Sequence, residues 1–380
     1  MSIFKKTLSC AVLAALGTCA LAGCGRQDTS NEAATSASPE ASAAITETVS
    51  ESTAASKQTP APDAPGTQST EPADVTSTPF GQHGALHVEN GKLTDADGSI
   101  VQLYGMSTHG IAWFPQYINY DSFRTLRDDW NTNCIRLAMY TAEYGGYCAG
   151  GDKEQLKQLV RDGVSYATEL GMYVIVDWHI LSDCDPNQNK DEAIAFFREM
   201  SEAFTDNDNV LYEICNEPNS GTSWDSIKSY AEEVIPVIRA QKPDAVILVG
   251  TPTWSQEIDK AAASPLTFDN VMYTLHFYAG THKDDLRNRL ETCAQSNLPV
   301  FVSEFGMCDA SGNGANDFDS TTKWLDLLNK YQISFCCWNL ANKDESSSVF
   351  KAASTALSDW TDEDFNESGR WIREYFRSMP

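Results

Sequence analysis

The sequence has few basic residues, which nucleic-acid-binding proteins require, and lacks the common motifs of metal- and nucleotide-dependent enzymes. Its 380 residues include only 27 lysines and arginines against 53 aspartates and glutamates, and the resulting net charge of −26 argues against binding to nucleic acid or directly to an anionic membrane. It also lacks a Gly-x-Ser-x-Gly elbow, a His-Glu-x-x-His zinc motif and a glycine-rich phosphate loop. We therefore expect no nucleic-acid partner, no metal ion and no cofactor.

Closely spaced Cys-x-x-Cys pairs are absent as well, although the chain contains 11 cysteines. Cys134, Cys215, Cys336 and Cys337 lie in apolar runs, where cysteine behaves as a small core residue. We expect buried, reduced thiols. Disulfides are the alternative in an exported protein, but the spacing indicates no pairing.

The N-terminal apolar run, over residues 8–20, is too short to span a bilayer comfortably. Two lysines precede it, and Leu21-Ala22-Gly23-Cys24 follows it and resembles a bacterial lipobox. The resemblance implies cleavage before Cys24 and a lipid on its sulfur, while an ordinary signal peptide is the alternative. We expect a lipoprotein signal over residues 1–24 and an extracellular protein that is held at the cell surface only by this anchor.

Residues 25–79 contain almost no aromatic or large aliphatic side chains and are dominated by Ala, Ser, Thr, Pro and Glu. Such a segment cannot bury enough apolar area to repay the entropy of ordering, so we predict a disordered linker. The remaining residues, 80–380, are enough for one large domain.

Eight short apolar runs recur within this domain, and they are continuous rather than alternating, as is typical of parallel strands buried on both faces. They are Val101–Ser107, Cys134–Tyr140, Tyr173–Trp178, Val210–Cys215, Val246–Gly250, Val271–Phe277, Pro299–Ser303 and Ser334–Trp338. Between them, helical spacing occurs over Lys153–Leu170, Asp191–Phe204, Trp224–Ala240, Asp284–Gln295 and Ser320–Tyr331. The alternation predicts an α/β fold, a (β/α)8 TIM barrel.

The competing architecture is a doubly wound open sheet, which usually has a glycine-rich turn after its first strand. The first run here ends in Ser107-Thr108-His109-Gly110, which is not such a turn. We expect residues 80–99 to form a hairpin across the bottom of the barrel, with Asp97-Gly98 as its turn.

Polar and aromatic residues gather where these predicted strands end. In a barrel all these ends open onto one face, where such enzymes keep their active sites. Glu217 follows the fourth strand and Glu304 lies at the end of the seventh, across the mouth from each other. Glycoside hydrolysis requires such a pair, one carboxylic acid to protonate the leaving oxygen and one carboxylate to attack the anomeric carbon.

The segments around both glutamates resemble the two active-site signatures of glycoside hydrolase family 5, in its bacterial endo-β-1,4-glucanase (cellulase) branch. They are Tyr212–Pro218 and Val302–Gly306, and the resemblance extends over nearly all of residues 85–345. Three places depart from the common pattern, at Ala112 with Pro115, at Met307-Cys308 and at Thr251-Pro252. None of them removes a catalytic group.

The resemblance implies a role for each site residue. Glu217 would be the acid/base and Glu304 the nucleophile of a retaining mechanism, and Asn216 would place its amide beside the sugar 2-hydroxyl. Arg136 would hold Glu304 ionised, Tyr278 would donate its hydroxyl to Glu304, and His276 would lie near Glu217. We expect the pKa of Glu217 to rise once the first step removes the charge of Glu304.

The expected sugar-binding residues are mostly aromatic, because pyranose rings present apolar C–H faces. The set comprises Trp113, Trp254, Trp338, Tyr140, His109, His179, Lys343 and Glu345. The expected partner is a β-glucan polysaccharide, bound by a monomer. Mannan and xyloglucan are alternative substrates, and a surface glycan-binding lipoprotein without turnover is the alternative of another class.

Overall fold

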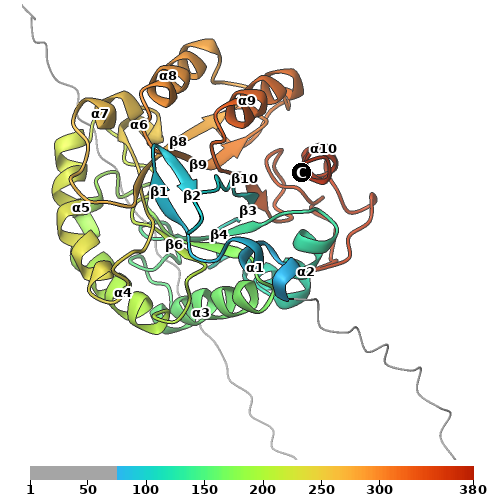
Figure 1. Cartoon of the computed structure of the whole chain (residues 1–380). Helices are drawn as coiled ribbons and strands as arrows, with labels where there is room; N and C mark the ends of the chain where they lie inside the picture. The colour runs from blue at the N-terminus through green and yellow to red at the C-terminus, as the bar shows by residue number, and fades with distance from the viewer. Residues whose placement is uncertain (1–74) are drawn as a thin grey trace, which may run out of the picture. The chain divides into compact units, whose positions relative to one another are not determined.

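The computed structural model describes residues 75–380, and it contains the predicted barrel (Figure 1). Eight parallel strands close on themselves in the order β10-β3-β4-β5-β6-β7-β8-β9. Their bounds are β3 Tyr104–Thr108, β4 Cys134–Tyr140, β5 Tyr173–His179, β6 Val210–Glu213, β7 Ile247–Val249, β8 Val271–Tyr278, β9 Val300–Gly306 and β10 Phe335–Leu340. All eight predicted runs are strands, and only their ends differ by a few residues.

Helices surround the barrel, as Figure 1 shows. They are α2 Tyr120–Asp128, α3 Lys153–Glu169, α4 Lys190–Ala203, α5 Trp224–Arg239, α6 Pro252–Ser255, α7 Ile258–Ala263, α8 Asp284–Gln295, α9 Phe318–Lys330 and α10 Glu367–Arg377. The five predicted helices agree with α3, α4, α5, α8 and α9. The prediction missed the short helices α6 and α7 and also α2 and α10. The last two pack through a few buried side chains each, among them Phe123 and Leu126 in α2 and Ile372 and Phe376 in α10.

A hairpin of β1 His87–Glu89 and β2 Lys92–Thr94 lies across the end of the barrel at which the strands begin (Figure 1). The helix α1 Pro79–His83 precedes it. Leu86 and Leu93 pack there against inward-facing strand residues such as Tyr173 and Phe301. The hairpin was predicted, but its turn is Asn90-Gly91, with both residues at positive φ. Asp97-Gly98 instead forms a second turn, between Thr94 and Ile100, which pair in an antiparallel bridge.

The predicted signal segment, Cys24 and most of the predicted linker lie outside the described residues. Within the linker range, residues 75–77 form a 3-10 helix and Pro79 begins α1, so the prediction of a disordered linker was wrong for these residues. No helix in the described part of the chain combines the length and apolar character that crossing a membrane requires.

The eight cysteines of the described residues are free thiols. Six are buried, including all four that were expected in strands, and Cys148 and Cys184 are partly exposed. The four cysteines that were expected in the core are therefore buried, Cys215 and Cys337 between the strands and the helices and Cys134 and Cys336 inside the barrel.

The outer layer makes a testable contribution to stability. Trp324 in α9 is fully buried, stacks on Phe277 of β8 at 4.0 Å between ring centroids and donates its Nε1–H to the His282 carbonyl. Trp324→Ala should lower the free energy of unfolding by about 3–5 kcal/mol, as for other buried aromatic truncations. Denaturant unfolding measures this, and the exposed neighbour Lys323→Ala should change it by less than about 0.5 kcal/mol. Equal effects of the two changes would contradict the packing described.

Candidate active site

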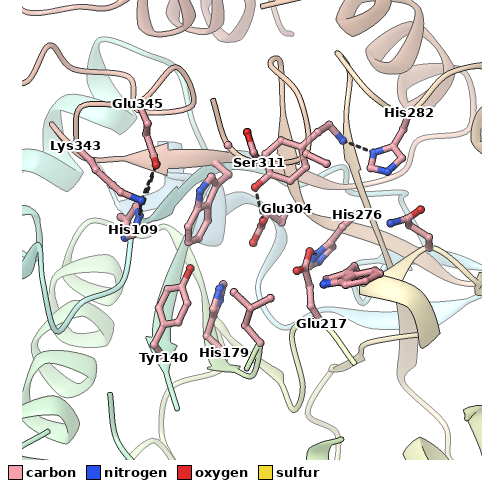
Figure 2. A pocket seen from close by; sticks show the side chains of 17 residues that line it. His109, Tyr140, His179, Glu217, His276, His282, Glu304, Ser311, Lys343 and Glu345 are labelled. Carbon is pink, nitrogen blue, oxygen red and sulfur yellow. Dashed lines mark hydrogen bonds and ion pairs between the residues drawn. The ribbon is translucent and has the colours of Figure 1, made fainter. Parts of the chain in front are cut away.

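A cleft of about 580 Å³ opens at the carboxyl ends of the barrel strands (Figure 2). Eleven of the predicted site residues line it: His109, Tyr140, His179, Glu217, Trp254, His276, Tyr278, Glu304, Trp338, Lys343 and Glu345. Arg136 and Asn216 lie just beneath its floor, with 0% and 1% of their surface exposed. Of the predicted residues in the described chain, only Trp113 belongs to neither group.

Glu304 is held at the end of β9 by two of the expected contacts. The Tyr278 hydroxyl donates to its Oε1 at 2.8 Å, and Arg136 Nη1 donates to its Oε2 at 3.2 Å. These two hydrogen bonds fix the orientation of the carboxylate, with one oxygen toward the hydroxyl and the other toward the guanidinium. Figure 2 shows it in the centre of the cleft.

Glu217 follows β6 and lies opposite Glu304. His276 Nδ1 is 2.9 Å from Glu217 Oε1, so the expected proximity of these two residues is present. One carboxylate oxygen of Glu217 and one of Glu304 lie within 4.8 Å of each other. This distance is shorter than the separation of about 6.5–9.5 Å between the two carboxyl groups of inverting glycosidases.

The pKa of Glu217 is already raised in the free protein. Burial is the main cause and the charge of Glu304 adds to it, while the hydrogen bond from His276 opposes the shift. The expected timing was therefore wrong. Removing the charge of Glu304 would lower the pKa of Glu217, because the nearby anion is one reason for its elevation.

Arg136 on β4 is a hub beneath both glutamates. Its Nε donates to Glu213 at 2.7 Å, and its Nη2 donates to Asn216 Oδ1 at 2.6 Å and lies 3.0 Å from Asp177. Its Nη1 donates to Ser107 Oγ and to Glu304 Oε2, both at 3.2 Å. All the donor groups of the guanidinium are therefore satisfied without water, as a buried cation requires.

The amide of Asn216 was expected to face the cleft, but in this structure it bonds to residues beneath it. Its Oδ1 accepts from Arg136, and its Nδ2 contacts His179 Nε2 at 3.2 Å and donates to the Ile180 carbonyl at 3.1 Å. In this structure Asn216 links Arg136 to His179.

Sequence reasoning missed three buried polar residues of this network. Glu213, Asp177 and Ser303 are each 0% exposed and connect Arg136, His179 and His276 from below. Arg136 lowers the pKa of Glu213 to about 2 against the opposing effect of burial. A signal was available, because an ionisable residue inside an apolar strand run must have a buried partner.

The aromatic side of the cleft is a set of stacked rings. The rings of His179 and Trp338 stack at 5.2 Å, Tyr140 lies 4.0 Å from His179, and His109 lies 5.1 Å from Trp338. Burial lowers the pKa of both His109 and His179 to about 3, so both are neutral at physiological pH. Neutral rings suit a neutral ligand.

The other two predicted tryptophans, Trp254 and Trp113, differ in whether they face the cleft. Trp254 is 44% exposed at the rim of the cleft, on a turn in which Thr253, Trp254 and Ser255 all have positive φ. Trp113 instead packs its ring against Tyr140 at 4.6 Å and donates its Nε1–H to the Tyr144 carbonyl. Trp113 therefore supports a cleft residue rather than facing the cleft.

Lys343 and Glu345 form one end of the cleft together with His109 (Figure 2). Lys343 Nζ is 2.6 Å from Glu345 Oε2 and 3.3 Å from His109 Nε2. Asn339 Nδ2 donates to Glu345 Oε1 at 3.1 Å, which fixes the glutamate from behind. The cleft is also lined by residues that the sequence reading did not select, namely Gln256, His282, Ala310, Ser311 and Gly312, all in loops with no chemical signature.

Three possible metal ligands meet in this cleft, Glu217, His276 and Glu304, and the described residues contain no other such group. The candidate ligand atoms of His276 and Glu217 already bond to each other. An ion here would compete with these hydrogen bonds and occupy the space between the two glutamates. The arrangement therefore suits acid–base and nucleophilic chemistry by the side chains themselves.

Comparison with known proteins agrees with this geometry. Residues 94–344 match the cellulase family, glycosyl hydrolase family 5. Endoglucanase A of Butyrivibrio fibrisolvens is 51% identical over 293 residues, which are 76% of this chain and 68% of that protein. An endoglucanase of Clostridium saccharobutylicum is 46% identical, over 80% of this chain and 66% of that protein. The chain thus spans about two thirds of the length of these relatives.

Solved structures extend the similarity to three dimensions. The catalytic domain of Thermobifida fusca endoglucanase Cel5A, in complex with cellotetraose, is 41% identical, with a TM-score of 0.76 over 80% of this chain and 100% of that domain. A structure of cellulase Cel5C_n is 43% identical, with a TM-score of 0.77 over 80% of this chain and 95% of that one.

The protonation of His276 predicts how stability depends on pH. Two carboxylates, Glu213 and Glu217, raise the pKa of His276 to about 9 against the effect of burial. A folded-state pKa above the unfolded value of about 6.5 stabilises the protein fully below pH 6.5, and this contribution is lost as the pH rises through about 9. We expect His276→Asn to flatten the fall in melting temperature between pH 6.5 and 9.5.

Thermal unfolding across this pH range measures the effect. His87→Asn, in the hairpin at the opposite end of the barrel, is the matched control and should keep the wild-type slope. An unchanged slope in His276→Asn would mean that His276 carries no extra proton in the folded protein.

Proposed function

The chain belongs to glycosyl hydrolase family 5, among its endoglucanases, and we propose that it hydrolyses internal β-1,4 linkages of cellulose-type and mixed-linkage β-glucans with retention of anomeric configuration. The observation that carries the mechanistic part is the approach of the Glu217 and Glu304 carboxylates to within 4.8 Å. Retaining enzymes place their two carboxyl groups about 5–5.5 Å apart.

In the first step of this proposal, Glu304 attacks the anomeric carbon and Glu217 protonates the departing glycosidic oxygen. Arg136 donates to one oxygen of Glu304 and the Tyr278 hydroxyl donates to the other, which orients the carboxylate for this attack. The raised pKa of Glu217 lets this residue carry a proton at a pH where an ordinary glutamate has lost it.

In the second step Glu217 acts as a base. Formation of the glycosyl ester removes the negative charge of Glu304, and the pKa of Glu217 falls because that charge had helped to raise it. Glu217 then accepts a proton from water as the water attacks the anomeric carbon. The products are two shorter chains, and both glutamates return to their initial state.

The walls of the cleft favour a chain of neutral sugars. Trp338 and Trp254 would present ring faces to successive pyranose units, and the neutral imidazoles of His109 and His179 carry no charge that would demand an ionic ligand. The Thermobifida enzyme binds cellotetraose in a domain of the same family, which supports a β-1,4-glucan here. The Lys343–Glu345 pair would contact hydroxyl groups at one end of that chain.

We expect the full-length protein to release reducing sugars fastest from carboxymethylcellulose and mixed-linkage β-glucan, and more slowly from mannan and xylan. Glu304→Gln should lose activity by at least about 10³-fold, because the amide cannot attack the anomeric carbon. The exposed Glu232→Gln on α5 is the matched control and should keep full activity.

Proton NMR of the first products then tests the stereochemistry. The β-anomer should form first and mutarotate afterwards. Early α-anomer would contradict the retaining mechanism, and faster cleavage of mannan or xylan would contradict the assigned substrate.

We also propose that this domain works at the outer cell surface as a lipoprotein, which the Leu21–Cys24 sequence supports. Cys24→Ala should then move the protein from the membrane pellet to the soluble fraction and abolish labelling by radioactive palmitate. Cys19→Ala, within the same signal segment, should leave both properties unchanged. Labelling that survives the loss of Cys24 would rule out this anchor.

A further inference from the structure

We infer that Ser255 is a positioning residue: its buried hydroxyl holds the turn that presents Trp254 and ties this turn to the segment that carries Glu217. The inference rests on the proposed function, because it concerns the sugar that departs with the glycosidic oxygen. It adds to the site a residue that is 0% exposed and acts without touching the substrate.

The turn that precedes Gln256 has an unusual backbone. Thr253, Trp254 and Ser255 have φ angles of 59°, 53° and 54°, so three successive residues other than glycine lie in the left-handed region. In this region the Cβ atom of an L-residue crowds the backbone, and single residues rather than runs are usual. The turn is therefore strained, and such a turn persists only where the surrounding structure holds it.

The Ser255 hydroxyl holds this turn from inside the protein through three hydrogen bonds. It donates to the Asn216 carbonyl at 2.7 Å, and it accepts from the Thr274 hydroxyl at 3.1 Å and from the Thr251 N–H at 3.2 Å. A serine hydroxyl has one donor and two acceptor positions, so every position is used. One side chain thus joins the segment after β7, strand β8 and the segment after β6.

Two contacts of the turn lie on either side of Glu217 in the sequence. The Ser255 hydroxyl bonds to the carbonyl of Asn216, and the Trp254 N–H donates to the carbonyl of Pro218 at 2.9 Å. The residues before and after the acid/base residue are therefore both fixed to the turn. The Trp254 side chain and the Glu217 side chain line the same cleft.

This connection gives the turn a role in the proposed reaction. Glu217 protonates the oxygen that departs, so the sugar bonded through that oxygen lies next to Glu217. Of the two tryptophans that line the cleft, Trp254 is the one tied to the Glu217 segment, whereas Trp338 stacks on His179. A ring held at a fixed distance from the acid can orient the departing sugar by stacking on its C–H face. Loss of the Ser255 hydroxyl should release the turn and misplace this ring.

Ser255→Ala tests this role with two substrates that differ in the group that departs. Carboxymethylcellulose releases a sugar chain, whereas β-cellobiosyl fluoride releases a single fluoride ion and places no sugar on the departing side. We expect kcat/KM to fall about 10-fold on carboxymethylcellulose and less than about 2-fold on the fluoride, because only the departing sugar is misplaced. An equal loss on both substrates would overturn the inference.

A double-mutant cycle shows whether Ser255 acts through Trp254. Trp254→Ala should lower activity on carboxymethylcellulose at least as much as Ser255→Ala does, and the double variant should be as active as Trp254→Ala alone. Losses that multiply would mean that Ser255 acts through another group, which contradicts the inference. Ser201→Ala removes a buried hydroxyl from α4 and is the matched control, and it should leave the ratio of the two activities unchanged.

Amide hydrogen exchange followed by NMR provides a readout that needs no substrate. The N–H groups of Thr251 and Trp254 should exchange at least about 10-fold faster in Ser255→Ala, because the first loses its acceptor and the second lies in the released turn, while the amides of α5 keep their wild-type rates. Unchanged exchange at both positions would refute the inference, even if the enzyme cleaves glucans. If the wild type cleaves no glucan, or if Glu304→Gln remains active, the proposed function fails, and the exchange rates still decide whether Ser255 holds the turn.

Discussion

The active site depends on one buried cation, the guanidinium of Arg136. Moving such a charge out of water costs several kcal/mol, and the protein offsets this cost with three carboxylates, an amide and a hydroxyl from different strands. The same contacts that neutralise Arg136 also orient Glu304 and keep Glu213 ionised. Electrostatic stability and catalytic geometry are therefore satisfied by one set of bonds.

The barrel makes this arrangement possible because neighbouring parallel strands present their ends to one face. Arg136 pairs in register with Ser107 of β3, Asp177 with Glu213 of β6, and His276 with Glu304 of β9. Side chains from adjacent strands are thus held about 5 Å apart by backbone hydrogen bonds. Strands hold Arg136, Glu213, His276 and Glu304, whereas Glu217 lies in the segment that follows β6.

The proposed mechanism uses two neighbouring electrostatic environments. Glu304 accepts hydrogen bonds from Arg136 and Tyr278, whereas burial and the charge of Glu304 raise the pKa of Glu217 against the hydrogen bond from His276. Two identical side chains can then act as nucleophile and as acid because their surroundings differ. Glu213 connects the two environments, since it contacts Arg136 directly and reaches His276 through Ser303.

The strands and most of the helices could be predicted from the sequence, because continuous apolar runs and helical spacing are local signals. The residues at the mouth of the barrel could be predicted because the Glu217 and Glu304 segments resemble a known family. It could not determine where Trp113 points, how Asn216 uses its amide, or that Glu213 and Ser303 complete the site. Those facts arise from contacts between residues distant in the sequence, such as Trp113 with Tyr144, 31 positions away, and Arg136 with Glu304, 168 positions away. Only closure of the barrel brings these groups together, and only burial makes their charges interdependent.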